Sequence, residues 1–188
     1  MSTNEERSFI ARVTCNGSPI TFLQELMLPA LLNTEALPKN IITAQNDYDR
    51  APKLVRDPFT NEMVPVGYSI PTKDTVVVHF ICYGDYYNMK IVGGPYDQMY
   101  ISHNDKPVLA ALPPAGANTT SFNLLDVAHN IITLDDLRSD RSTVYLKARN
   151  AGVIRKQITT NTDRYSVFND RSGDIVKFEL NILKRHAV

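Results

Sequence analysis

The sequence predicts a single all-β domain. Residues 75–83 and 176–183 alternate with the two-residue period of a strand, so that successive side chains point to opposite faces. Eleven prolines and eight glycines are scattered between short apolar runs, which is typical of an all-β chain with many turns. A chain of 188 residues has the usual length of one domain and can bury about 70% of its unfolded surface.

The two alternating segments predict different environments. In residues 75–83 both sets of alternate side chains are largely apolar, which predicts a strand buried on both faces. Near the C-terminus the apolar side chains of Val176, Phe178, Leu180 and Ile182 alternate with polar ones. This pattern predicts an antiparallel strand with one face in the core and one in solvent.

A weak internal repeat runs through the chain. Residues 31–47, 88–105 and 145–163 share four features in the same order. These are an apolar pair, a turn, an Ile followed by Thr or Ser, and a polar turn that ends in Asp. The spacing from Leu32 to Met89 and from Met89 to Leu146 is 57 residues in each case. Opening strands are predicted at 9–13, 76–81 and 131–135, and closing strands at 63–70, 121–125 and 177–180. Three copies, at approximately 8–73, 74–130 and 131–188, nearly fill the chain.

The third copy carries a resemblance to a known superfamily. Residues 144–155 are similar to the "apolar-Leu-x-Ala-x-Asn-Gly-x-apolar-apolar" hairpin of fascin-like and growth-factor-like β-trefoils. The resemblance implies a β-trefoil, in which three four-stranded units surround a pseudo-threefold axis. The chain has no tryptophan, so the Gln-x-Trp sugar site of ricin-type trefoils cannot be carried over. The alternative is a β-sandwich in which short strands and Asn/Asp turns recur without a true repeat.

Composition and the distribution of apolar residues limit the classes of partner and the cellular location that we expect. Lys+Arg and Asp+Glu are 20 each, so the chain lacks the basic excess typical of nucleic-acid binding. No apolar run approaches the roughly 20 residues that span a bilayer. The polar N-terminal residues lack the apolar region of a secretory signal, and Cys15 and Cys82 are expected to be reduced and buried. A cytoplasmic or non-classically secreted protein is expected.

No catalytic or metal-binding motif is recognisable. The four histidines lie outside any HExxH, His-x-His or Cys-x-x-Cys pattern, and no nucleophile elbow or phosphate-binding loop is present. The sequence therefore predicts a protein that is not an enzyme and that uses no cofactor or metal.

Tyrosines are concentrated in one region and predict a carbohydrate site. Five of the nine lie between residues 83 and 100, mixed with acids and amides. Sugars stack on aromatic faces while carboxylates and amides bind their hydroxyls. The predicted ligand-binding residues are Asp85, Tyr86, Tyr87, Tyr96 and Asp97. The alternative is that these tyrosines are ordinary strand residues.

A second candidate is the apolar, proline-rich segment 107–118. Trefoil protease inhibitors insert such loops into active-site clefts, and prolines reduce the entropy lost on binding. The candidate inhibitory residues are Leu109, Leu112, Pro113 and Pro114. The alternative is a core strand followed by a proline turn.

The leading function is non-catalytic carbohydrate (lectin-like) binding, with protease inhibition and a fascin-like protein contact as alternatives. The expected partner is therefore a glycan or a protein. The apolar segment 22–32 is either an insertion that packs on the core or a patch for a second copy in a homo-oligomer.

Overall fold

The computed structural model describes residues 2–23, 39–45, 53–56, 63–66, 75–105, 107–158 and 165–187. These residues form strands and two short 3-10 helices. The strands are β1 (Phe9–Cys15), β2 (Ser18–Phe22), β3 (Ile42–Gln45), β4 (Lys53–Arg56), β5 (Met63–Val66), β6 (Val77–Tyr83), β7 (Tyr86–Ile91), β8 (Tyr100–His103), β9 (Leu109–Leu112), β10 (Ser121–Leu125), β11 (Ile131–Ile132), β12 (Arg141–Ala148), β13 (Arg155–Ile158), β14 (Tyr165–Asn169), β15 (Asp174–Ile175) and β16 (Phe178–Arg185). The helices are η3 (Gly116–Asn118) and η4 (Leu134–Asp136).

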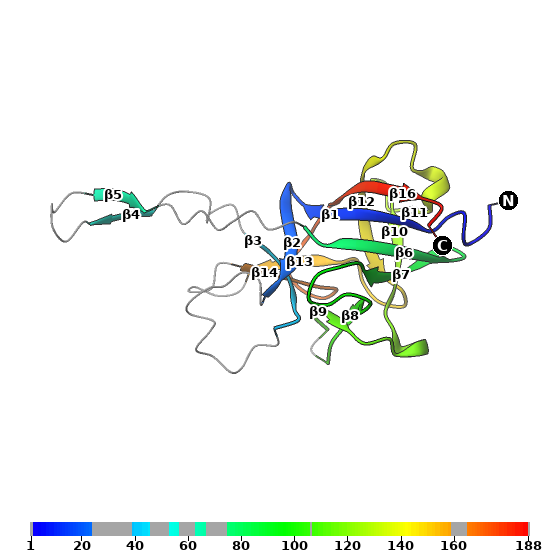
Figure 1. The fold of residues 1–188 in the computed structure, drawn as a ribbon, viewed down its shortest axis with the longest axis horizontal. Helices are drawn as coiled ribbons and strands as arrows, with labels where there is room; N and C mark the ends of the chain where they lie inside the picture. Colours follow the sequence, from blue (N-terminus) through cyan, green and yellow to red (C-terminus); the bar gives the residue numbers. More distant parts are fainter. Residues whose placement is uncertain are drawn as a thin grey trace.

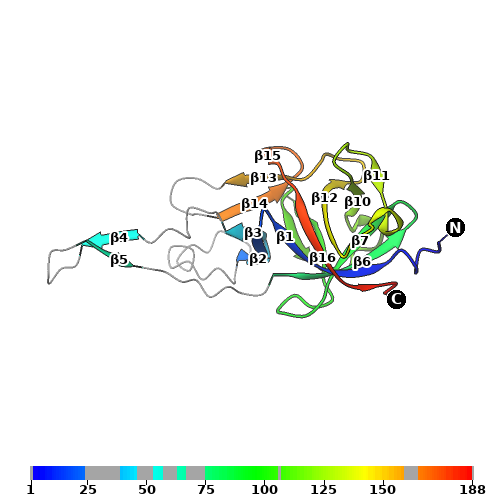
Figure 2. The ribbon, with the colours of Figure 1, turned by 90° about the horizontal axis from the view of Figure 1, so that it is seen from above.

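Six antiparallel strands close a barrel (Figure 1). Strand β1 pairs with β6, β6 with β7, β7 with β10, β10 with β12, β12 with β16, and β16 again with β1. Strands β1, β6 and β16 run side by side in Figure 2. Because the ring closes, each of the six strands pairs with a neighbouring strand on both of its sides.

Three hairpins cap the barrel: β2–β3, β8–β9 and β13–β14. Their second strands also meet one another. Strand β3 pairs with β14, Ile41 forms a bridge with Ala110, and Val108 forms a bridge with Asn169. The three hairpins therefore form one connected cap.

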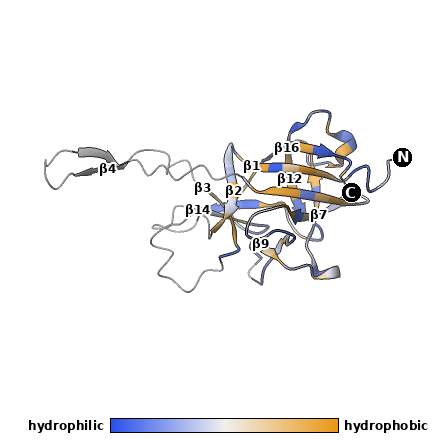
Figure 3. Cartoon of the chain, viewed as in Figure 1, coloured by the Kyte–Doolittle hydropathy of each residue, from blue (hydrophilic) through white to orange (hydrophobic). Residues whose placement is uncertain are grey.

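Alternate side chains of the barrel strands fill the core, as the pleat requires. Phe9 stacks on Phe80 with ring centroids 4.5 Å apart, and Tyr87 meets both rings edge-on. Figure 3 shows hydrophobic residues concentrated on the barrel strands. The predicted inward side chains Val176, Phe178, Leu180 and Ile182 are all buried, so that prediction is confirmed.

The prediction for residues 75–83 needs correction. Val78, Phe80 and Cys82 are buried in the barrel, but Val77, His79 and Ile81 on the other face are only partly buried. The described residues therefore cover the outer face of β6 only in part.

Two predicted repeat strands occupy other places in the fold. Residues 63–66 form β5, which pairs with β4 in a separate two-stranded sheet. Residues 131–135 give the short strand β11, which pairs with β10 outside the closed ring, and the start of η4. Leu31 and Leu32 of the first copy, and most of the apolar segment 22–32, lie outside the described residues.

Candidate functional site

An open groove of about 540 Å³ lies on the outer face of the barrel. It is lined by three tyrosines, three smaller polar side chains, one cation and part of the segment before β10. We call it the tyrosine groove, and its lining residues are Tyr83, Tyr86, Tyr100, Asn88, Thr119, Ser121, Arg149, Pro114, Gly116 and Ala117.

The strand pleat explains the aromatic wall of the groove. In β7 the side chains of Tyr87, Met89 and Ile91 point into the barrel, so Tyr86 and Asn88 point outward. Tyr83 is the cross-strand partner of Tyr86 in the β6–β7 hairpin. Their rings stack with centroids 5.9 Å apart and planes 21° from parallel. The hairpin thus presents a two-ring aromatic surface.

Arg149 covers part of that surface. Its guanidinium carbon lies 3.8 Å from the centre of the Tyr86 ring, in cation–π geometry. Arg149 follows β12 and is fixed through its backbone, because its N–H donates to the carbonyl of Ser121 at 2.8 Å. The stack therefore joins β7 to the turn after β12.

Polar groups lie beside the rings. The Ser121 hydroxyl donates to Oδ1 of Asn88 at 2.7 Å, across the β7–β10 pairing. This bond uses the carboxamide oxygen, and the Nδ2 group of Asn88 makes no hydrogen bond within the described residues. The groove therefore combines aromatic faces with amide and hydroxyl groups.

The predicted ligand residues do not form one site. Tyr86 lies in the groove, whereas Tyr87 is a core residue that is 0% exposed, so it cannot contact a ligand. Tyr96 packs edge-on against Phe22 with ring centroids 4.5 Å apart. It therefore packs against the core rather than in the groove.

The two predicted acids have roles in turns. Asp97 Oδ1 accepts a hydrogen bond from the N–H of Gly93 at 2.7 Å, and that bond is the main reason why the pKa of Asp97 is lowered. The carbonyl of Asp85 accepts a hydrogen bond from Nδ2 of Asn123 at 2.7 Å, which fixes the β6–β7 turn against β10. Neither acid lines the groove.

The proline-rich segment divides into a buried and an exposed part. Leu109 is buried in β9 and Leu112 is partly buried, so these side chains belong to the cap and do not project as an inhibitory loop would require. Pro113 and Pro114 are exposed, and Pro114 lines the tyrosine groove. The Thr119 hydroxyl accepts a hydrogen bond from the Ala115 N–H at 3.0 Å and holds this part of the chain in shape.

Sequence reasoning missed several groove residues. Tyr83 and Tyr100 belong to the tyrosine-rich region, but the predicted site omitted them. A strict two-residue alternation through β7 would have placed Tyr86 outside and Tyr87 inside. No local signal marks Arg149, because it reaches the groove only through the β10–β12 pairing.

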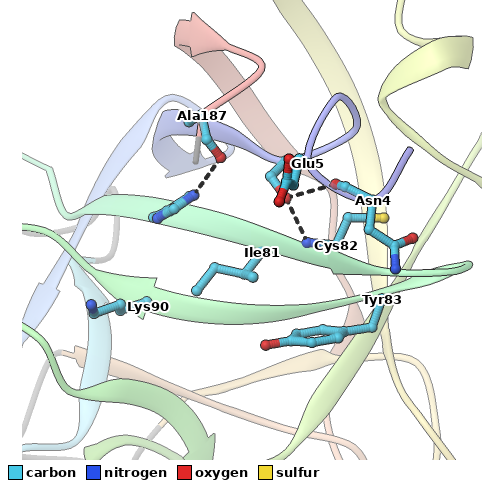
Figure 4. A pocket seen from close by; sticks show the side chains of 9 residues that line it. Asn4, Glu5, Ile81, Cys82, Tyr83, Lys90 and Ala187 are labelled. Atoms are coloured by element: carbon cyan, nitrogen blue, oxygen red, sulfur yellow. Dashed lines mark hydrogen bonds between the residues drawn. The ribbon is translucent and has the colours of Figure 1, made fainter. Parts of the chain in front are cut away.

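A second pocket, of about 450 Å³, lies between β6, β7 and the two ends of the described chain. Figure 4 shows its lining side chains, including Asn4, Ile81, Lys90 and Ala187. Several of its polar groups bind one another: His79 Nε2 lies 3.0 Å from the Ala187 carbonyl, and the Cys82 N–H donates to the Ser8 hydroxyl at 2.9 Å. These bonds join the chain ends to the barrel, so the tyrosine groove is the better candidate for a ligand.

Residues with nucleophilic or metal-binding chemistry are dispersed. Among the described residues no three His, Cys, Asp or Glu side chains come together as metal ligands. Cys15 and Cys82 are free and buried, as predicted, and burial raises the pKa of Cys15 to about 11. A thiol with a raised pKa is a poor nucleophile at neutral pH. Within the described part of the chain, no helix has the length and apolar character needed to cross a bilayer.

Comparisons of the chain with models of protein families, with curated proteins and with solved structures each found no match.

Proposed function

We propose that this chain is a β-trefoil that binds an oligosaccharide, without catalysis, in the tyrosine groove. The observation that carries the proposal is the outward-facing pair Tyr83 and Tyr86, with Tyr100, Asn88 and Ser121 around the same groove. Pyranose rings present apolar C–H faces to aromatic side chains, and their hydroxyls bind amide and hydroxyl groups.

Support for the trefoil assignment comes from the pairing order. A ring of six strands with three hairpins that meet at one end is what three four-stranded units around an axis would produce. On this assignment the units are residues 9–83, 86–125 and 141–185, each with two barrel strands and one capping hairpin. We propose these boundaries in place of 8–73, 74–130 and 131–188, because β6 then closes the first unit.

The shape of the groove also fits a saccharide better than a small apolar ligand. It is open to solvent rather than enclosed, and its lining combines aromatic and polar side chains. A saccharide needs both kinds of contact, because its two faces and its edge differ in polarity.

The Tyr86→Ala variant tests the proposal. We expect the affinity for glycans selected on a glycan array to fall by about tenfold, because the stacking surface and the Arg149 platform are lost together. Titration calorimetry measures the change, and thermal unfolding shows whether the fold is intact.

The matched control is Tyr145→Ala. Tyr145 is also a partly buried barrel tyrosine, but it stacks on His129 away from the groove. Equal glycan affinity of the Tyr86→Ala variant and the wild type would refute the site. An array without any selective hit would refute carbohydrate binding itself.

Protease inhibition is the second candidate function, and one observation favours it. Residues 113–118 are all exposed, contain two prolines and are held by the Ala115–Thr119 hydrogen bond. Such a segment loses little entropy when a protease binds it. We expect a Pro114→Gly variant to inhibit less than the wild type in a protease panel, whereas a panel without inhibition would exclude this candidate.

A further inference from the structure

Electrostatics in the tyrosine groove identify the class of saccharide. Of its lining side chains, Arg149 carries the one formal charge, and no acidic side chain is among them. Asp85, which directly precedes Tyr86, lies in the β6–β7 turn and does not line the groove. The groove as described is therefore cationic.

Arg149 retains its hydrogen-bonding capacity. Its guanidinium stacks on the Tyr86 ring, and its side-chain N–H groups have no hydrogen-bond or ion-pair partner among the described residues. Stacking uses the face of the guanidinium and leaves its edge, with N–H donors in a fixed fork, to bind an anion. A carboxylate or sulfate matches this fork with two parallel hydrogen bonds.

The stacked position also makes the donor rigid. A free arginine side chain loses substantial rotamer entropy when it binds an anion. Arg149 is an exposed residue, but its backbone is fixed by the bond to Ser121 and its head group lies on an aromatic ring. Part of the conformational entropy of the Arg149 side chain is therefore already lost before a ligand binds.

A second cation, Lys147, lies on the same strand as the residues that lead to Arg149, although it does not line the groove. Lys147 lies two residues before Arg149 on β12, between the buried side chains of Leu146 and Ala148, so it points to the outer face of the barrel. It lies opposite Asn123 on β10. No acidic partner of Lys147 is present among the described residues.

We infer that the saccharide bound in the tyrosine groove is anionic, with a carboxylate or sulfate on the edge of the Arg149 guanidinium and a sugar ring on the tyrosine surface. This inference rests on the proposed function and adds the charge of the ligand.

Matched acidic and neutral saccharides test the inference. On the array we expect the hits to be glycans that carry a carboxylate or a sulfate. In solution, an oligogalacturonide is compared with its methyl ester, and dextran sulfate with dextran. The first pair tests the carboxylate and the second tests the sulfate, in each case with the same sugar backbone. We expect the charged member of at least one pair to bind about tenfold more tightly or better, and its binding to weaken as salt is raised.

Two variants then assign the effect to Arg149. Arg149→Gln should remove the preference for the charged member of the pair. Arg149→Lys should keep part of it, because the charge remains while the two parallel hydrogen bonds are lost. The control is Arg141→Gln, which removes an exposed cation from the start of β12, at the other end of the strand that Arg149 follows, and should leave the preference unchanged.

The outcomes separate the two claims. Selective binding of neutral glycans, or equal affinity for both members of each pair, would overturn the inference and leave carbohydrate binding standing. Binding of acidic glycans that Arg149→Gln and Arg141→Gln affect equally would also overturn it. An array and saccharide pairs without any binding would overturn both claims.

Discussion

Tyr87 has its ring in the core and its hydroxyl at the barrel wall. The hydroxyl oxygen accepts a hydrogen bond from the Leu134 N–H at 3.0 Å, and burial raises the pKa of Tyr87. A buried backbone N–H needs such a partner, because leaving it unpaired costs free energy. The residue is therefore structural, although it lies next to Tyr86 of the proposed site.

The first prediction concerns this hydroxyl. Tyr87→Phe keeps the ring but leaves the Leu134 N–H unpaired, so the free energy of unfolding should fall by about 1–2 kcal/mol. Chemical denaturation measures it. Tyr145→Phe is the control, since the Tyr145 hydroxyl has no hydrogen bond within the described residues. Equal stability of the two variants would contradict the assigned role.

His103 provides the second prediction at the residue scale. Burial lowers its pKa, Asp170 opposes that effect and Arg171 adds to it. The His103 Nε2 atom lies 3.8 Å from Oδ1 of Asp170, and neither atom has a hydrogen-bond partner. Because the folded-state pKa lies below the unfolded value of about 6.5, the unfolded state binds the proton first as pH falls.

We therefore expect the free energy of unfolding to decrease as pH falls from about 6.5 toward the lower pKa of the folded state. His103→Gln should remove this part of the pH dependence, measured by denaturation at pH values of about 7.5 and 5.5. The control is His129→Gln, which changes an exposed histidine. If the free energy of unfolding changed equally between the two pH values in both variants, the assignment to His103 would be contradicted.

At the scale of elements, the third capping hairpin depends on one glycine. Gly173 connects β14 to β15 with a φ of +94°, and a Cβ there would lie 2.2 Å from the Lys156 carbonyl oxygen. Lys156 lies in β13, which pairs with both β14 and β15. A side chain at position 173 would thus collide with the backbone of β13, the strand that pairs with both β14 and β15.

Gly173→Ala should lower the free energy of unfolding by at least about 2 kcal/mol, because strain from the positive φ adds to the collision. The matched control is Gly93→Ala, which has a φ of +79° but no atom within 4 Å of the added carbon. We expect this control to cost about 1 kcal/mol. Thermal or chemical unfolding that gave equal losses would show that the backbone moves away from the new carbon.

At the scale of the whole molecule, the barrel closes where its first strand in the chain, β1, pairs with its last strand, β16. Strand β1 pairs with β6 on one side and with β16 on the other. Its first residue, Phe9, stacks on Phe80 and contacts Tyr87. Phe9 thus joins β1 to β6 and β7 through one aromatic cluster.

Phe9→Ala should lower the free energy of unfolding by about 3–5 kcal/mol, as expected for a buried aromatic residue that leaves a cavity. Because the ring of strands closes, we expect one cooperative transition, with far-UV and near-UV circular dichroism changing together. Phe9→Leu should lose less. Two separate transitions would contradict a single closed core.

The sequence alone determined the features that depend on neighbouring residues. The alternation of residues 176–183 correctly predicted which side chains are buried, and the polar–apolar pattern correctly predicted an all-β chain. Both follow from the two-residue period of a strand, which needs no knowledge of the partner strand. The expectation that Cys15 and Cys82 are free and buried, which was based on the lack of a secretory signal, is also confirmed.

Only the tertiary structure decided which strands pair and therefore which side chains share a surface. It placed Tyr86 outside and Tyr87 inside, left one face of β6 partly exposed, and brought Arg149 onto the Tyr86 ring. Arg149 and Tyr86 are far apart in the sequence and meet because β10 pairs with both β7 and β12. Strand pairing is decided by packing of the whole core, so no local pattern in the sequence contains the position of Arg149.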